Sequence, residues 1–134
     1  GLVRIGEGLT SEGKTVFPVS ISGNNGLSAA TFTVRSEAPL AGIKSTDGKE
    51  LRFTRSVDQE SGLNVYTIDF KDARAVIADR ELFRLIVNGD KGAKADDYKL
   101  SLGYSDASGR TGHPTKLHIG ERPVPAPADS RRPF

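Results

Sequence analysis

The sequence of this chain predicts an all-β domain. Apolar and polar residues alternate with period two in several segments, as in strands that bury one face. Between these segments lie clusters rich in Gly, Asn, Asp and Ser, which supply the backbone conformations of tight turns. A helical period is weak wherever it occurs, so paired strands are expected to form most of the chain.

Each expected strand has its own apolar face. The segments are TVFPVSIS (15–22), ATFTVR (30–35), ELRFTRS (50–56), NVYTIDF (64–70) and YKLSLGY (98–104). The core is expected to contain Phe17, Phe32, Phe53, Tyr66, Phe70, Leu85 and Leu100. One segment, KDARAVIADRELF (71–83), fits a helical period weakly, and a turn or irregular crossover fits it equally well.

Length and composition divide the chain into a body and a tail. The 134 residues suit one domain of ordinary size. We expect this domain to cover residues 1–120, because four of the seven prolines lie in residues 121–134. A proline-rich segment of this kind prefers extended conformations and forms no core. We interpret it as a linker or tail; a docking peptide is the alternative.

Charge and composition exclude several classes of function. The charged residues of 122–134 sum to +2, which equals the net charge of the whole chain, so residues 1–121 are neutral. A neutral body lacks the basic surface that nucleic-acid binding requires. The chain has no cysteine, which excludes disulfides and thiolate chemistry. No apolar run approaches the roughly 20 residues of a membrane helix, and any secretion signal is expected to lie outside this sequence.

Three stretches in order resemble the cohesin domain, the jelly-roll module of scaffoldins and related bacterial and archaeal surface proteins. GKTVFPVSIS followed by GLSAATFTVR resembles the opening hairpin of the family and its next, partner-facing strand. ELFRLIVNGDKGAKADDYKLSL resembles a late strand, a Gly/Ala turn and the eighth strand, and SDASGRTG resembles the turn before the last strand. The resemblance implies a nine-stranded jelly-roll sandwich, extracellular or on a cell surface, that binds a dockerin, a small calcium-loaded helical pair.

No catalytic pattern appears. His113 and His118 are five residues apart, which on a strand sends them to opposite faces and away from a shared metal. Asp96 and Asp97 are adjacent and therefore diverge, so they make a poor acid/base pair. A surface calcium ion is conceivable at Asp90, Asp96 or Asp106, but the full calcium-loop pattern is missing. We expect a non-enzymatic, monomeric domain without a resident metal or cofactor.

Two binding hypotheses remain, with a structural spacer or adhesin domain as a third. A carbohydrate-binding module would stack sugars on exposed aromatic rings; the chain has no Trp, and we expect Tyr104 to be its one exposed Tyr platform. A protein-binding module would use the flat outer surface of one sheet. If the arrangement of the family holds, that surface carries Thr31, Thr33, Arg35, Arg52, Thr54, Val65, Thr67, Asp69, Lys99 and Ser101. We favour the protein-binding module.

Overall fold

The computed structural model describes residues 1–23, 26–48, 51–76, 79–109 and 111–120. The expected tail, 121–134, lies outside the described residues.

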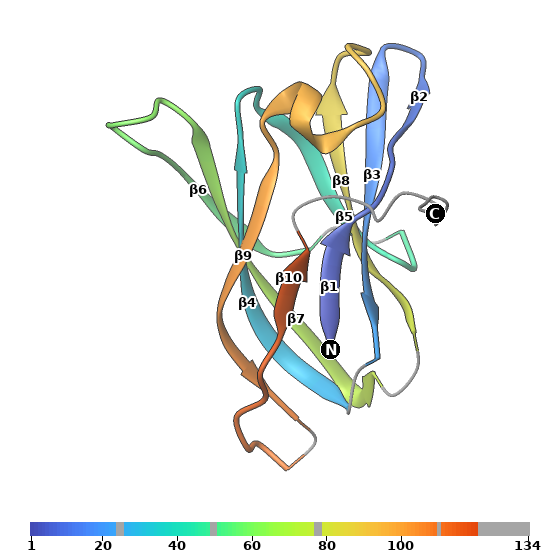
Figure 1. Ribbon diagram of the computed structural model, residues 1–134, viewed down its shortest axis with the longest axis vertical. Coiled ribbons are helices and arrows are strands. Elements are labelled where there is room, and N and C mark those ends of the chain that lie inside the picture. The colour runs from blue at the N-terminus through green and yellow to red at the C-terminus, as the bar shows by residue number, and fades with distance from the viewer. Residues whose placement is uncertain (24–25, 49–50, 77–78, 110, 121–134) are drawn as a thin grey trace, which may run out of the picture.

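Two sheets pack face to face (Figure 1), and the expected jelly-roll sandwich is confirmed. The described residues form ten strands rather than nine, of which β2 and β10 have three residues each. Among the described residues, no helix is long and apolar enough to cross a membrane.

The first sheet has the strand order β10-β1-β3-β8-β5, with β2 paired to β3. Its strands are β1 (Leu2–Ile5), β2 (Leu9–Ser11), β3 (Lys14–Ser22), β5 (Leu40–Ser45), β8 (Arg80–Asn88) and β10 (His118–Gly120). All of its pairs are antiparallel except β1 with β10. The second sheet has the order β6-β7-β4-β9 and is antiparallel throughout. Its strands are β4 (Leu27–Ser36), β6 (Phe53–Val57), β7 (Asn64–Val76) and β9 (Ser101–Ser108).

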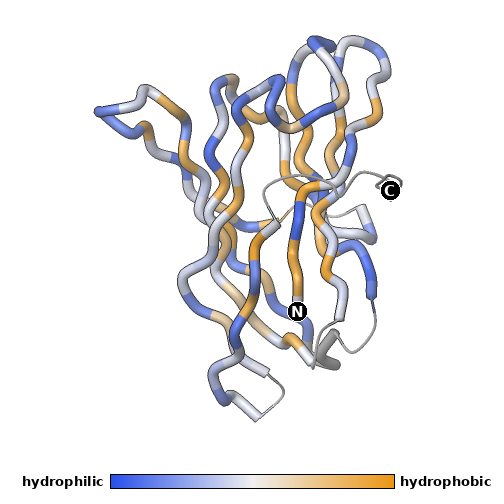
Figure 2. The backbone as a smooth tube through the Cα atoms, in the orientation of Figure 1, coloured by the Kyte–Doolittle hydropathy of each residue, from blue (hydrophilic) through white to orange (hydrophobic). Residues whose placement is uncertain are grey.

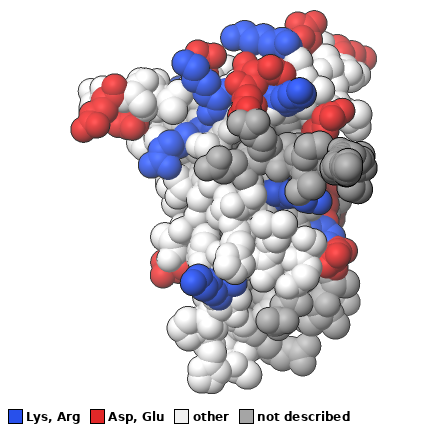
Figure 3. All heavy atoms as spheres, in the orientation of Figure 1, with Lys and Arg blue, Asp and Glu red and all other residues white. Residues whose placement is uncertain are grey.

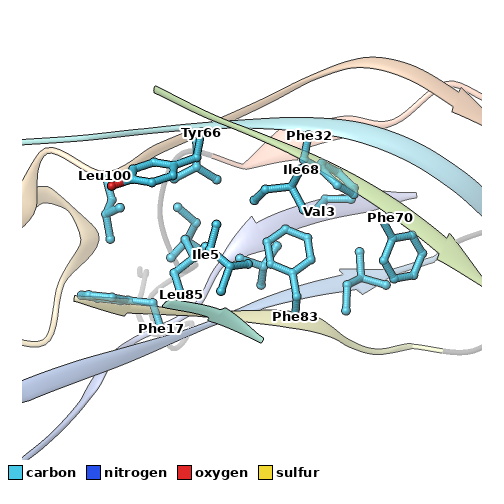
Figure 4. Packing of buried hydrophobic residues seen from close by; sticks show 14 of the residues in the cluster. Val3, Ile5, Phe17, Phe32, Tyr66, Ile68, Phe70, Phe83, Leu85 and Leu100 are labelled. Atoms are coloured by element: carbon cyan, nitrogen blue, oxygen red, sulfur yellow. The ribbon is translucent and has the colours of Figure 1, made fainter. Parts of the chain in front are cut away.

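Hydrophobic and hydrophilic residues alternate along the strands, as the colours of the tube in Figure 2 show, and the burial of the side chains alternates with them. On β4, Ala30, Phe32 and Val34 are buried, and the residues between them point outward. The two inner faces meet in one core, where Phe32 lies 5.5 Å from Phe83 and 6.4 Å from Phe70 between ring centroids (Figure 4). Side chains of this size dominate the free energy of burial, so these contacts hold the sheets together.

The predicted core is confirmed except at one position. The residues Phe17, Phe32, Tyr66, Phe70, Leu85 and Leu100 are all buried. Phe53, however, remains 39% exposed. It begins β6, an edge strand whose residues are all exposed and which runs out from the body with its hairpin (Figure 1). One side of its ring packs on the buried Tyr66, at 5.7 Å between ring centroids.

The helical alternative for 71–83 is wrong. Residues 71–76 continue β7, and residues 80–83 begin β8; residues 77–78 lie outside the described part of the chain. In the first segment, Lys71 and Val76 pair with β4 across a register irregularity. In the second, Arg80, Glu81 and Phe83 pair with β3. Tertiary pairing therefore overrides the weak helical period.

The strand expected over 98–104 begins later than predicted. Tyr98 ends a short 3₁₀ helix, η1 (Ala95–Tyr98), and β9 starts only at Ser101. Lys99 lies between them in the left-handed conformation, with φ of 53°. This break takes Lys99 out of the sheet, so its expected place on the outer strand surface is wrong.

Candidate functional site

The outer surface of the β6-β7-β4-β9 sheet gathers most of the residues predicted to bind a partner. Across its middle, Thr54 of β6 pairs with Thr67 of β7, Thr67 pairs with Thr33 of β4, and Thr33 pairs with Gly103 of β9. Paired residues in neighbouring strands point to the same face. The result is a row of threonines across three strands that ends at a glycine, which we call the threonine row.

Two further rows of outward residues flank the threonine row, one on each side. Toward η1, the row consists of Ser56, Val65, Arg35 and Ser101. On the other side, Thr31 lies between Asp69 of β7 and Asp106 of β9. These residues and the threonine row together form what we call the outer face. The predicted residues brought together here are Thr31, Thr33, Arg35, Thr54, Val65, Thr67, Asp69 and Ser101.

The two remaining predicted residues differ in position. Arg52 precedes β6 and lines a shallow depression together with Thr54, Thr67 and Asp69, so it borders the outer face. Lys99 lies beyond the end of β9, where its ammonium is 3.5 Å from a carboxylate oxygen of Glu37. Arg52 thus lies where it can contact a partner on the outer face, whereas Lys99 belongs to the η1 end of the molecule.

The outer face is polar, and its charges are separated along the strands. Arg35 lies at the end nearer η1, and Asp69 and Asp106 lie on either side of Thr31 at the opposite end. The Thr31 hydroxyl donates a long hydrogen bond of 3.5 Å to Asp69. A second shallow depression covers this end and includes Asp69, Lys71 and Asp106. A partner on the outer face would therefore meet Arg35 at one end. At the other end it would meet the two carboxylates together with Arg52 and Lys71, which line the same two depressions.

Sequence reasoning missed Ser56, Gly103 and Asp106 as members of the outer face. The alternation in β9 could have indicated that Gly103 shares a side with Ser101. Asp106 could not have been found that way, because the register between β4 and β9 shifts between Thr31 and Phe32. Such an irregularity changes which side the following residues face.

Tyr104 is not the exposed platform that the carbohydrate hypothesis expected. It pairs with the buried Phe32 and packs against the core, which places its ring on the inner side of β9. All three tyrosines of the chain use their hydroxyl to accept a backbone N–H from another segment. Tyr66 accepts from Leu40 at 2.8 Å, Tyr98 from Lys91 at 2.8 Å and Tyr104 from Leu117 at 3.0 Å. The tyrosines therefore anchor loops to the sandwich.

The histidines and loop acids form no common centre. Within the described residues, no three His, Cys, Asp or Glu side chains gather closely enough to hold a metal ion. Asp106 belongs to β9, whereas Asp90 and Asp96 belong to the segment between β8 and β9. Asp97 accepts the backbone N–H of Lys94 at 3.0 Å and so caps η1. His113 is exposed in a loop, and His118 is exposed on β10.

Charged side chains are unevenly distributed over the molecule. Figure 3 shows them gathered mainly over the end that carries η1 and the β2–β3 turn, with fewer on the lower part of this side. At that end, the ammonium groups of Lys91 and Lys99 lie 3.7 and 3.5 Å from the carboxylate of Glu37. Exposed ion pairs of this kind contribute little to stability, and here two ammonium groups share the one carboxylate of Glu37.

The fold is that of solved cohesin domains. A non-cellulosomal cohesin from the archaeon Archaeoglobus fulgidus superposes with a TM-score of 0.58 at 12% identity, covering 88% of this chain and 84% of that one. A cohesin from a type I cohesin–dockerin complex of Clostridium thermocellum gives 0.57 at 12% identity, covering 90% and 96%. The seventh ScaB type I cohesin of Pseudobacteroides cellulosolvens gives 0.53 at 15% identity, covering 98% and 97%.

Comparisons of the sequence with known families and proteins give no match. No protein-family model matches the chain. No curated protein matches it closely enough to count as a relative. Low identity combined with near-complete coverage means that the likeness lies in the arrangement of strands. The resemblance noted in the sequence is thereby confirmed at the level of architecture: the chain has a cohesin-like fold.

Proposed function

We propose that this chain is a non-catalytic recognition module whose outer face binds a dockerin-like helical protein. The observation that carries the proposal is the threonine row, which crosses three strands and lies between Arg35 and the Asp69–Asp106 pair. Two of the solved structures with this fold are complexes of a cohesin with a dockerin. The proposed role is assembly or anchoring of a larger extracellular or cell-surface protein.

The chemistry of the outer face suits a helix. Threonine hydroxyls both donate and accept hydrogen bonds, so the row can match the varied polar groups that a helix presents. The side chains of the sheet surface are short, so the longer side chains of a helix can project onto it and make most of the contacts. Arg35 and Arg52 can each bind a carboxylate through two parallel hydrogen bonds, which makes them the expected anchors.

Calorimetric titration against a panel of dockerin modules in calcium tests the proposal. The panel includes the dockerins of the two solved complexes. A dockerin is expected to bind the wild type, and chelation of calcium is expected to abolish the binding. Thr33→Glu is expected to weaken binding by about 2 kcal/mol, because it places an unpaired charge at the centre of the interface.

The control variant is Ser20→Glu, on the outward side of β3 in the other sheet, where its strand partners are Arg4 of β1 and Glu81 of β8. It should bind dockerins as the wild type does. An equal loss of dockerin affinity in Thr33→Glu and Ser20→Glu would mean that the outer face is not the binding surface. A parallel titration with soluble glycans tests the carbohydrate alternative, and saturable glycan binding without dockerin binding would overturn the proposal.

A further inference from the structure

Gly103 occupies an unusual position on the outer face. It lies inside β9 and closes the threonine row beside Thr33. The residues on either side of it in the chain, Leu102 and Tyr104, pack against the core. A side chain at position 103 would therefore point outward, and its absence leaves a notch at the end of the threonine row.

The fold does not require glycine at this position. Gly103 is not among the glycines with a positive φ, so its backbone suits any residue. A Cβ built on it would meet no atom within 4 Å, whereas a Cβ at Gly8 would approach the Thr15 methyl group to 2.7 Å. The irregularity in the β4–β9 register falls between the pairs of Asp106 and Tyr104, beyond Gly103.

Glycine in the interior of a strand lowers stability, because it loses more backbone entropy on folding and packs no side chain. Where neither a positive φ nor crowding within the fold demands it, close approach of another molecule is one of the reasons for a strand glycine. The open space above Gly103 lies on the surface that the proposed function assigns to the partner.

We propose that Gly103 is the point at which one helix of the dockerin-like partner comes closest to the sheet, and this inference rests on the proposed function. Alternate residues of a strand are about 6.8 Å apart, and helix residues four apart are separated by about 6 Å along the axis. A helix lying along β9 would thus place successive turns over Ser101, Gly103 and the residues that follow.

The charges beside the notch define the partner further. Arg35 pairs with Ser101 on one side of Gly103, and Asp106 lies farther along β9 on the other side. The complementary helix carries a small side chain at the notch, a carboxylate toward Arg35 and a Lys or Arg toward Asp106. Within the described part of the chain, no Lys or Arg forms an ion pair with Asp106 that would compete for this contact.

The test compares Gly103→Val with Gly42→Val, using the dockerin modules of the panel as probes. Gly42 lies on β5 of the other sheet, and its Cβ would meet only the Ile86 side chain at an ordinary 3.8 Å. Both variants are expected to fold, with Gly103→Val unfolding at the same temperature as the wild type or higher. Gly103→Val should weaken dockerin binding at least about 30-fold, Gly103→Ala less, and Gly42→Val not at all.

Each outcome discriminates. If a dockerin binds the wild type and binds Gly103→Val equally well, the notch proposal is overturned while the outer face stands. If a dockerin binds the wild type and Thr33→Glu with equal affinity, the outer face is not the binding surface. Absence of binding by every dockerin of the panel overturns both. A loss of binding in Gly103→Val that is accompanied by a lower melting temperature counts against the notch, because the space would then be needed by the fold.

Discussion

The hydroxyl of Tyr98 lies 3.1 Å from that of Thr15, inside the sandwich and across a separation of 83 residues in the chain. The Thr15 hydroxyl donates its proton to the carbonyl of Gly89 at 2.9 Å, so Tyr98 is the donor to Thr15. Tyr98 in turn accepts the backbone N–H of Lys91 at 2.8 Å. This chain of hydrogen bonds ties the segment before β9 to β3.

Removal of one hydroxyl tests this link. Tyr98→Phe leaves the Lys91 N–H without its acceptor and removes the donor to Thr15, so the free energy of unfolding should fall by about 1–2 kcal/mol. Urea denaturation measures the change. The ring contact with Phe17, at 5.7 Å between centroids, is kept in this variant, so a loss well above this range would point to a packing change instead.

The different burial of two phenylalanines gives a second prediction. Phe32→Ala removes a fully buried ring and should cost about 3–5 kcal/mol of unfolding free energy. Phe53→Ala should cost about 1 kcal/mol, because that ring is 39% exposed on the edge strand β6. Chemical denaturation of both variants compares them directly. Equal losses would place Phe53 in the core after all.

The turn between β6 and β7 contains a carboxyl group with a shifted pKa. The Ser61 hydroxyl donates to Asp58 at 2.9 Å and the Glu60 N–H donates at 3.1 Å, and these bonds lower the pKa of Asp58 below its ordinary value of 3.8. Ser61→Ala should raise the pKa of Asp58 toward that value, which an NMR titration of the Asp58 carboxyl measures. An unchanged pKa would show that the hydroxyl does not stabilise the charged form.

The sign of the pH dependence follows from the same shift. Because the pKa of Asp58 is lower in the folded than in the unfolded chain, its contribution to stability is present above the unfolded pKa. It is lost as the pH falls through the folded pKa. The stability of Ser61→Ala should therefore match that of the wild type more closely in strong acid than at neutral pH.

The proposed anchors of the outer face should differ in strength. Arg35→Ala should weaken dockerin binding by about 2 kcal/mol, and Arg35→Lys should restore only part of it, because lysine cannot form the paired hydrogen bonds of a guanidinium. Lys99→Ala is the control, since Lys99 lies off the sheet beside Glu37. Calorimetry at two salt concentrations measures each affinity. A larger effect at Lys99 than at Arg35 would contradict the outer face as the binding surface.

The sequence alone determined the two-sided character of the strands. Side-chain direction alternates along any extended chain, so the burial of Phe32 and the outward position of Thr33 follow from local pattern. The same reasoning determined the threonine-rich character of the outer face, because Thr31 and Thr33 share one side of β4 whatever lies next to it. The absence of Trp from the sequence likewise argued against a sugar-stacking surface.

Only the tertiary structure decided which strands are neighbours and where each one ends. The threonine row exists because β6, β7, β4 and β9 pair in that order and register, which depends on contacts between residues far apart in the chain. The same long-range pairing leaves Phe53 on an edge, and the 3₁₀ helix before β9 removes Lys99 from the sheet. Local alternation carries no information about the partner of a strand, and a shift of one residue reverses the face that a side chain occupies.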